Sequence, residues 1–244
     1  MKTKKILLSF LIIIMSVFLT FCSNDEDDNP VAPETKEPAK LEIKEIQLPE
    51  HMTQVQDSYA QLAVAFVQMA NGFRNYATFF NPPSGATHIP KSSGVQDEWT
   101  WQEGTLTIRL VYDENDEMVY WKIYLTGTFE GYTVNNWLGA EAEQTKDGNS
   151  GHLKIYEPPT NNLIAEWNWN VGSDGSYSFV FLGYENSQKI EVTVNADNSG
   201  ILQIYNSVGG QFVLQYKITW TATGSGQWWE YDTAGNVVDQ GSWV

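Results

Sequence analysis

The sequence predicts a mainly β domain, an antiparallel meander of about eleven to twelve strands that forms a barrel or half-barrel with one long N-terminal helix in or across its lumen. Two observations predict it. Bulky apolar residues recur at intervals of three and four between Met52 and Phe80, which is the spacing of one helix face. From Asp97 onward apolar and polar residues alternate between turn clusters, as in strands with one buried and one wet face.

The first 21 residues have the layout of a signal peptide. Lys2, Lys4 and Lys5 form a basic start, an apolar run covers 6–19, and Cys22 follows shortly after. The segment resembles the signal of bacterial lipoproteins, which implies that the cysteine becomes the lipidated, palmitate-bearing first residue of the mature chain. It is the only cysteine, so no internal disulfide is expected. The alternatives are an uncleaved anchor and a secreted protein with a free thiol.

The segment after Cys22 is acidic and then rich in proline and charge. Its run 23–28 resembles the export tag that sends some Gram-negative lipoproteins to the cell surface, and a solvated spacer on the periplasmic side of the outer membrane is the alternative. Such a composition cannot form a core and behaves as an extended tether. We therefore divide the chain into a signal peptide (1–21), a tether (22–48) and one folded domain (49–244).

The formal net charge of −16 restricts the partners. A surface this acidic repels phosphate backbones, which excludes nucleic acid as the main partner. We expect the lipid anchor to attach the protein to a membrane. A dimer through a coiled coil is disfavoured because Phe and Tyr would occupy the seam positions of the helix, so we expect a monomer.

The predicted helix has an apolar stripe with small residues beside it. Pro49 is suited to its first turn, and 81–83, Asn-Pro-Pro, ends it. Ala63, Ala70 and Ala77 follow one side of the stripe, so neighbouring elements can approach closely. The stripe consists of Met52, Val55, Tyr59, Leu62, Phe66, Met69, Phe73, Tyr76 and Phe80.

The strand region contains a weak internal repeat. The segment 149–156 matches 198–205, which lies 49 positions later, and 104–108 echoes it. Propeller blades would repeat in this way, but only about three units fit, fewer than the four to eight blades of propellers. We interpret the repeat as one hairpin solution used several times, and a two-sheet sandwich remains the alternative to a barrel.

The size of the predicted barrel leaves room for the helix. Eleven or twelve strands enclose a wider lumen than the eight that side chains alone can fill, and a helix is about 10 Å across. The helix is then either a plug or a lid over a cavity. This architecture is similar to that of the periplasmic lipoprotein carriers and insertion factors that hold acyl chains, and the resemblance is one of architecture alone.

The ten tryptophans are the most suggestive candidates for binding. Aromatic rings can line a pocket for an apolar ligand or stack on sugars, and as an alternative they are simply core residues. Trp228 and Trp229 are adjacent in a strand and point to opposite faces, which makes one of them a candidate for exposure. The predicted ligand-binding residues are Trp99, Trp101, Trp121, Trp167, Trp169 and Trp229.

Other chemistry finds little support in the sequence. His51, His88 and His152 lie far apart and lack the spacing of metal ligands, so we expect no metal site and no cofactor. Glu141 and Glu143 would share one strand face about 6 to 7 Å apart, a separation compatible with hydrolysis of a glycosidic bond. Charged side chains on a wet face are the commoner reason for such a pair.

These observations favour a non-catalytic lipoprotein of the cell envelope. We expect it to bind an apolar small molecule between helix and sheet. The alternative is a surface-exposed glycan- or protein-binding lipoprotein whose helix plugs the core, and a carboxylate-based glycoside hydrolase is the third class. The sequence does not identify the ligand.

Overall fold

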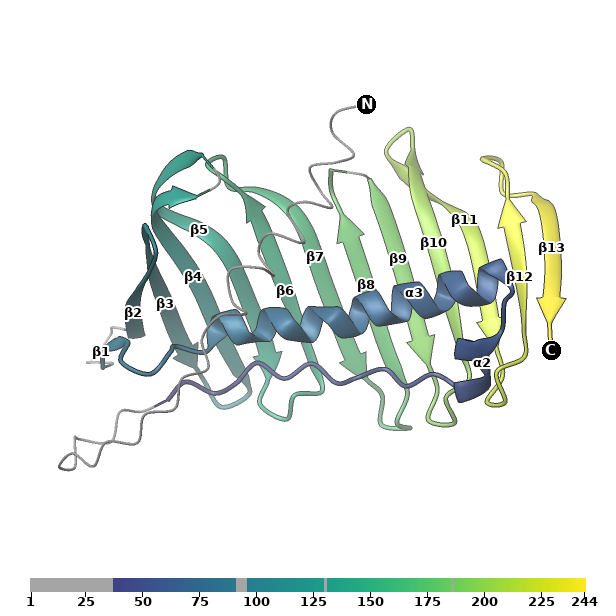
Figure 1. Ribbon diagram of the computed structural model, residues 1–244, viewed down its shortest axis with the longest axis horizontal. Coiled ribbons are helices and arrows are strands. Elements are labelled where there is room, and N and C mark those ends of the chain that lie inside the picture. The colour runs from purple at the N-terminus through teal and green to yellow at the C-terminus, as the bar shows by residue number, and fades with distance from the viewer. Residues whose placement is uncertain (1–36, 91–95, 130, 186) are drawn as a thin grey trace. The chain divides into compact units, whose positions relative to one another are not determined.

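The computed structural model describes residues 37–90, 96–129, 131–185 and 187–244. Cys22, the signal peptide and the acidic run lie outside the described residues. The unit Glu37–Val244 contains one sheet of 13 antiparallel strands, in the order β1 to β13, so each strand pairs with its neighbours in sequence (Figure 1). The prediction of a mainly β antiparallel meander is confirmed.

Most of the strands are joined by short hairpin turns. Their bounds are β1 (Thr87–Ile89), β2 (Asp97–Glu103), β3 (Leu106–Glu114), β4 (Met118–Phe129), β5 (Tyr132–Thr145), β6 (Ser150–Glu157), β7 (Asn162–Val171), β8 (Tyr177–Gly183), β9 (Gln188–Val194), β10 (Gly200–Val208), β11 (Gln211–Trp220), β12 (Gly226–Tyr231) and β13 (Val237–Trp243).

The sheet is open. Within the described residues β1 and β13 form its two edges and do not pair with each other, so a closed barrel is not confirmed. A single sheet also excludes the two-sheet sandwich for this part of the chain. One helical segment lies across the strands and covers one face, and a sheet covered in this way can bury its apolar side without closing on itself (Figure 1).

The helical stretch consists of three pieces instead of one long helix. They are α2 (Glu50–Gln54), α3 (Ser58–Gly72) and the 3-10 helix η1 (Phe73–Phe80). The break after α2 has a local cause: the carboxylate of Asp57 accepts hydrogen bonds from the backbone N–H groups of Tyr59 and Ala60, at 2.9 and 3.0 Å, and so caps a new helix.

Aromatic contacts show how the helical stretch crosses the sheet. Tyr59 at its start stacks on Trp228 of β12, with ring centroids 3.8 Å apart. Phe73 packs on Trp167 of β7 at 4.2 Å, and Phe80 at the far end meets Trp121 of β4. The helical stretch therefore crosses the strands, and it begins over β12 and ends over β4.

The face of α3 that is most buried is made of small residues. Its buried positions are Ala60, Ala63, Val64, Val67 and Ala70. The large residues of the predicted stripe within α3 are half-buried beside this row. Small side chains let the helix axis approach the sheet, and the larger ones then fill the space along its sides.

Residues 37–48, which we call the strap, belong to the folded unit, although the sequence indicated a tether up to residue 48. Leu41, Ile43 and Ile46 are buried in the same core as the helix. The amide of Asn71 holds the strap in place, because it accepts from the N–H of Ile46 at 2.8 Å and donates to the Ile46 carbonyl at 2.9 Å.

The internal repeat corresponds to a pairing of glycine with tryptophan across neighbouring strands. In each pair the indole ring lies over the glycine, so that a Cβ at that position would overlap the ring. Gly104, in the weaker echo of the repeat, lies instead in a turn with a φ of +58°. Gly151 with Trp169 and Gly200 with Trp220 are the pairs within the repeat, and Gly226 with Trp243 and Gly241 with Trp228 are further pairs outside it.

Two turns of the same type differ in their surroundings and provide a matched test. Gly224 and Gly235 both have positive φ, +92° and +84°, and each donates its N–H to the residue three positions earlier. A Cβ at Gly224 would lie 2.8 Å from the backbone nitrogen of Met52 in α2, whereas a Cβ at Gly235 would have nothing within 4 Å. Gly224 is thus the point where the β11–β12 turn contacts α2.

We expect Gly235→Ala to lower the free energy of unfolding by about 1–2 kcal/mol, the cost of a left-handed alanine. Gly224→Ala should lower it by a further 1–3 kcal/mol or so, because α2 must also move. Chemical denaturation followed by circular dichroism measures both values. Equal losses in the two variants would show that α2 does not depend on this turn.

Candidate functional site

The sheet face opposite α3, which we call the outer face, carries the polar half of each strand. Trp121, Ala142 and Leu153 are buried in the core with the helix. Because side chains alternate along a strand, their neighbours Lys122 and Glu141 point to the other side. One row of the outer face pairs residue by residue from β4 to β13: Tyr120, Glu143, His152, Asn168, Val180, Glu191, Gln203, Lys217, Trp229 and Gln240.

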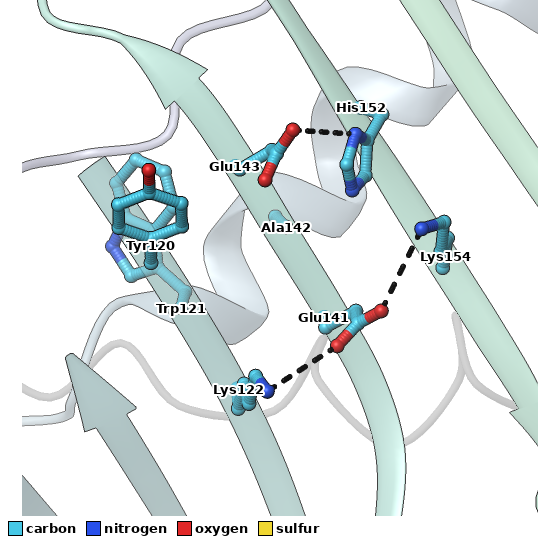
Figure 2. A pocket seen from close by; sticks show the side chains of 8 residues that line it. All are labelled: Tyr120, Trp121, Lys122, Glu141, Ala142, Glu143, His152 and Lys154. Atoms are coloured by element: carbon cyan, nitrogen blue, oxygen red, sulfur yellow. Dashed lines mark ion pairs between the residues drawn. The ribbon is translucent and has the colours of Figure 1, made fainter. Parts of the chain in front are cut away.

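A shallow pocket of about 180 Å³ lies on β4, β5 and β6. Figure 2 shows its polar side chains on one side of these strands, with Glu141 and Glu143 between the flanking residues of β4 and β6. Glu141 and Glu143 thus share one face, as their spacing predicted. The lining residues are Tyr120, Trp121, Lys122, Glu141, Ala142, Glu143, His152 and Lys154.

Glu141 is the centre of an ion-pair network. Its carboxylate oxygens lie 3.7 Å from Nζ of Lys122 and 3.8 Å from Nζ of Lys154 (Figure 2). The hydroxyl of Tyr156 also donates to Oε1 of Glu141, at 2.6 Å. Two ammonium groups and a hydroxyl thus surround this carboxylate. Charge-assisted contacts of this kind hold a side chain in one position.

Glu143 pairs with His152 beside this network. Oε1 of Glu143 lies 3.1 Å from Nδ1 of His152 (Figure 2). Burial lowers the pKa of His152, and the neighbouring Glu143 carboxylate opposes that shift. Burial and the hydrogen bond to Glu141 raise the pKa of Tyr156. At neutral pH the pocket therefore presents a neutral imidazole, and the phenol of Tyr156 beside it stays protonated and donates to Glu141.

The predicted tryptophans fall into two groups. Trp99, Trp121, Trp167 and Trp169 are buried in the core on the helix side, and Trp101 packs partly buried against the same core. Trp229 lies on the outer face, where Nζ of Lys217 is 5.1 Å from its ring centroid. Its neighbour Trp228 faces the helix, so the two point to opposite sides as expected.

The tyrosines of the outer face were not among the predicted site residues. Tyr120 and Tyr156 alternate with core residues in the same way as many other residues of these strands. The alternation predicts their exposure, but only the pairing of β4, β5 and β6 brings them together with the glutamates. The signal available in the sequence was the Tyr that ends each copy of the repeat, Tyr156 and Tyr205.

Two further features concern metals and membranes. Across residues 37–90, 96–129, 131–185 and 187–244, no three His, Cys, Asp or Glu side chains gather in a way that could hold a metal ion. In the same part of the chain, no helix combines the length and the apolar character needed to cross a membrane.

Comparison with known proteins assigns no function to these residues. No protein-family model matches the chain, and no curated protein matches it in sequence. Any role of the outer face therefore has to be inferred from the side chains that form it.

Proposed function

We propose that this chain is a non-catalytic binding module whose outer face binds a glycan. The observation that carries the proposal is the combination, in one pocket, of the Tyr120 ring with the polar groups of Glu143, His152 and Lys154. Sugars offer an apolar ring face and a rim of hydroxyls, which suits amphipathic aromatic rings beside hydrogen-bonding groups. The contact between Glu143 and His152 and the ion pair between Lys154 and Glu141 hold these polar groups in position before a ligand arrives.

The packing of α3 supports a ligand on the outer face and a helix that plugs the core. Ala60, Ala63 and Ala70 are at most 2% exposed, so the helix lies close against the sheet. Phe73 and Phe80 continue this packing onto Trp167 and Trp121. The tryptophans that could have lined a cavity on this side contribute instead to the core.

We also propose that the protein is an outer-membrane lipoprotein, anchored through Cys22 and exposed at the cell surface. The proposal rests on the basic start, the apolar run and the acidic segment that follows the cysteine. Because the folded unit begins at residue 37, the tether would cover 22–36. A glycan-binding face would then operate at a short distance from the membrane.

Binding of the full-length protein to a glycan array tests the function. We expect at least one glycan to bind, and Tyr120→Ala to weaken its binding about tenfold, the size of a hot-spot residue. The control is Gln68→Ala, because Gln68 is exposed on α3 and away from the outer face. No glycan bound, or equal weakening by both variants, would overturn the proposal.

A second candidate is the expected apolar ligand between α3 and the sheet. The indole N–H groups of Trp167 and Trp169 are buried there without an acceptor among the described residues. Buried donors usually have a partner, and an ester or carboxyl oxygen of a lipid would supply one. Bound lipid in native mass spectrometry, or uptake of a fluorescent fatty acid that Trp167→Phe weakens, would favour this candidate over the glycan.

A further inference from the structure

The outer face carries three pairs in which a tyrosine hydroxyl donates to a glutamate on the preceding strand. The glutamates lie 25 residues apart in the sequence, on β5, β7 and β9. The pairs are Tyr156 with Glu141 at 2.6 Å, Tyr184 with Glu166 at 3.1 Å, and Tyr205 with Glu191 at 2.8 Å.

The strand order determines the spacing of these pairs. Tyr156 and Tyr205 lie on β6 and β10, and Tyr184 directly follows the end of β8. Each pair is thus displaced from the next by two strands, which corresponds to about 10 Å across the sheet. Glu141 and Glu166 lie in one cross-strand row, whereas Glu191 lies two residues further along its strand, in the row of Glu143. Since Glu141, Glu166 and Glu191 alternate with core residues, all three point to the outer face, and the pairs form a series that runs across the strands.

The tyrosine side chains of the series are at least partly accessible to solvent, and their hydroxyl groups are protonated at neutral pH. Tyr184 is 46% exposed, and Tyr156 and Tyr205 are half-buried. Burial and the hydrogen bond to Glu191 raise the pKa of Tyr205 to about 12, so its hydroxyl remains a donor at neutral pH. Lys189 stabilises the pair of Tyr205 and Glu191, because its Nζ lies 4.1 Å from the Tyr205 ring centroid and 2.9 Å from Oε1 of Glu191.

We infer that a neutral, extended β-linked glycan lies across the strands over these three pairs, with one disaccharide repeat on each pair. The inference rests on the proposed glycan-binding function. The disaccharide repeat of an extended β-1,4-linked chain is close in length to the two-strand step between the pairs, whereas α-1,4-linked chains coil. The net charge of −16 and the glutamates of the series disfavour polyanionic glycans.

Titration calorimetry of the full-length protein with cello- and chito-oligosaccharides of two, four and six sugars tests the inference. We expect the affinity for at least one series to rise about tenfold or more from the disaccharide to the hexasaccharide, because linked subsites act together. Maltohexaose, an α-linked chain of equal length, should bind more weakly than the β-linked hexasaccharide. Tyr184→Ala should remove most of the gain with length, and Tyr184→Phe should keep more of it.

Tyr132→Ala is the matched control, because Tyr132 is 49% exposed and lies outside the series. Affinity that does not depend on length, equal binding of maltohexaose, or equal losses in Tyr132→Ala and Tyr184→Ala would overturn this inference. If the array still shows a glycan bound in a manner dependent on Tyr120, the proposed function stands without it. If no glycan binds on the array or in the titrations, both fail.

Discussion

Replacing Trp121 with alanine is expected to lower the free energy of unfolding by about 3–5 kcal/mol, the range for removing a large aromatic side chain from a core. Trp121 is fully buried in β4 and packs at ring-centroid distances of 6.2 Å from Tyr112 and 6.3 Å from Phe80. Its indole N–H donates to the carbonyl of Ala39 at 3.0 Å. The substitution therefore leaves a cavity under η1 and also releases the start of the strap.

Trp121→Phe separates these two effects. Phenylalanine keeps part of the ring volume but loses the N–H, so the loss should be smaller, and proteolysis within the strap should still become faster. Urea denaturation measures the stability, and limited proteolysis with mass spectrometry locates the cleavage.

Trp229→Ala is the control for a tryptophan of the opposite face. We expect this substitution to lower the free energy of unfolding by less than about 1 kcal/mol, since the Trp229 side chain lies on the outer face and not in the core. A loss below 1 kcal/mol for Trp121→Ala, or similar losses for Trp121 and Trp229, would contradict the role assigned to Trp121.

Gly200→Ala is expected to lower the free energy of unfolding by about 1–3 kcal/mol, the usual cost of overpacking a filled space. A Cβ at this position would overlap the Trp220 ring and lie 2.6 Å from the carbonyl oxygen of Thr193. The ring cannot easily swing aside, because the indole N–H of Trp220 donates to the carbonyl of Asn198 at 2.8 Å. The strands β9, β10 and β11 would have to separate.

Gly72→Ala is the matched glycine substitution with the opposite expected sign. Gly72 lies in the last turn of α3, and a Cβ there would meet nothing within 4 Å. Alanine should raise the free energy of unfolding by about 0.5–1 kcal/mol, because it restricts the unfolded chain and favours the helix. Thermal and urea denaturation of both variants provide the comparison. A neutral or stabilising Gly200→Ala would show that the glycine is not needed beneath the ring.

The features that could be predicted from the sequence are those with a local period. Alternation in stretches such as 119–126 and 212–220 predicted strands with one buried face, and the structure has β4 and β11 there. Phe212 departs from this prediction: it is 46% exposed, because the register of β10 and β11 shifts between Tyr216 and Leu214. The same alternation placed Trp228 and Trp229 on opposite faces. For the candidate site, it placed Glu141 and Glu143 together on one face, because side-chain direction in a strand depends only on position along it.

The features that only the tertiary structure decided depend on residues far apart in the chain. The open sheet, the strap on the core and the close approach of α3 through Ala60, Ala63 and Ala70 follow from how elements pack. The sequence by itself determined most of the strands from Asp97 onward and which side of them is apolar, but not β1, which lies in a predicted loop. The structure decided that α3 covers that side and that three Tyr–Glu pairs form on the other, because a local period specifies the direction of a side chain but not the element that it meets.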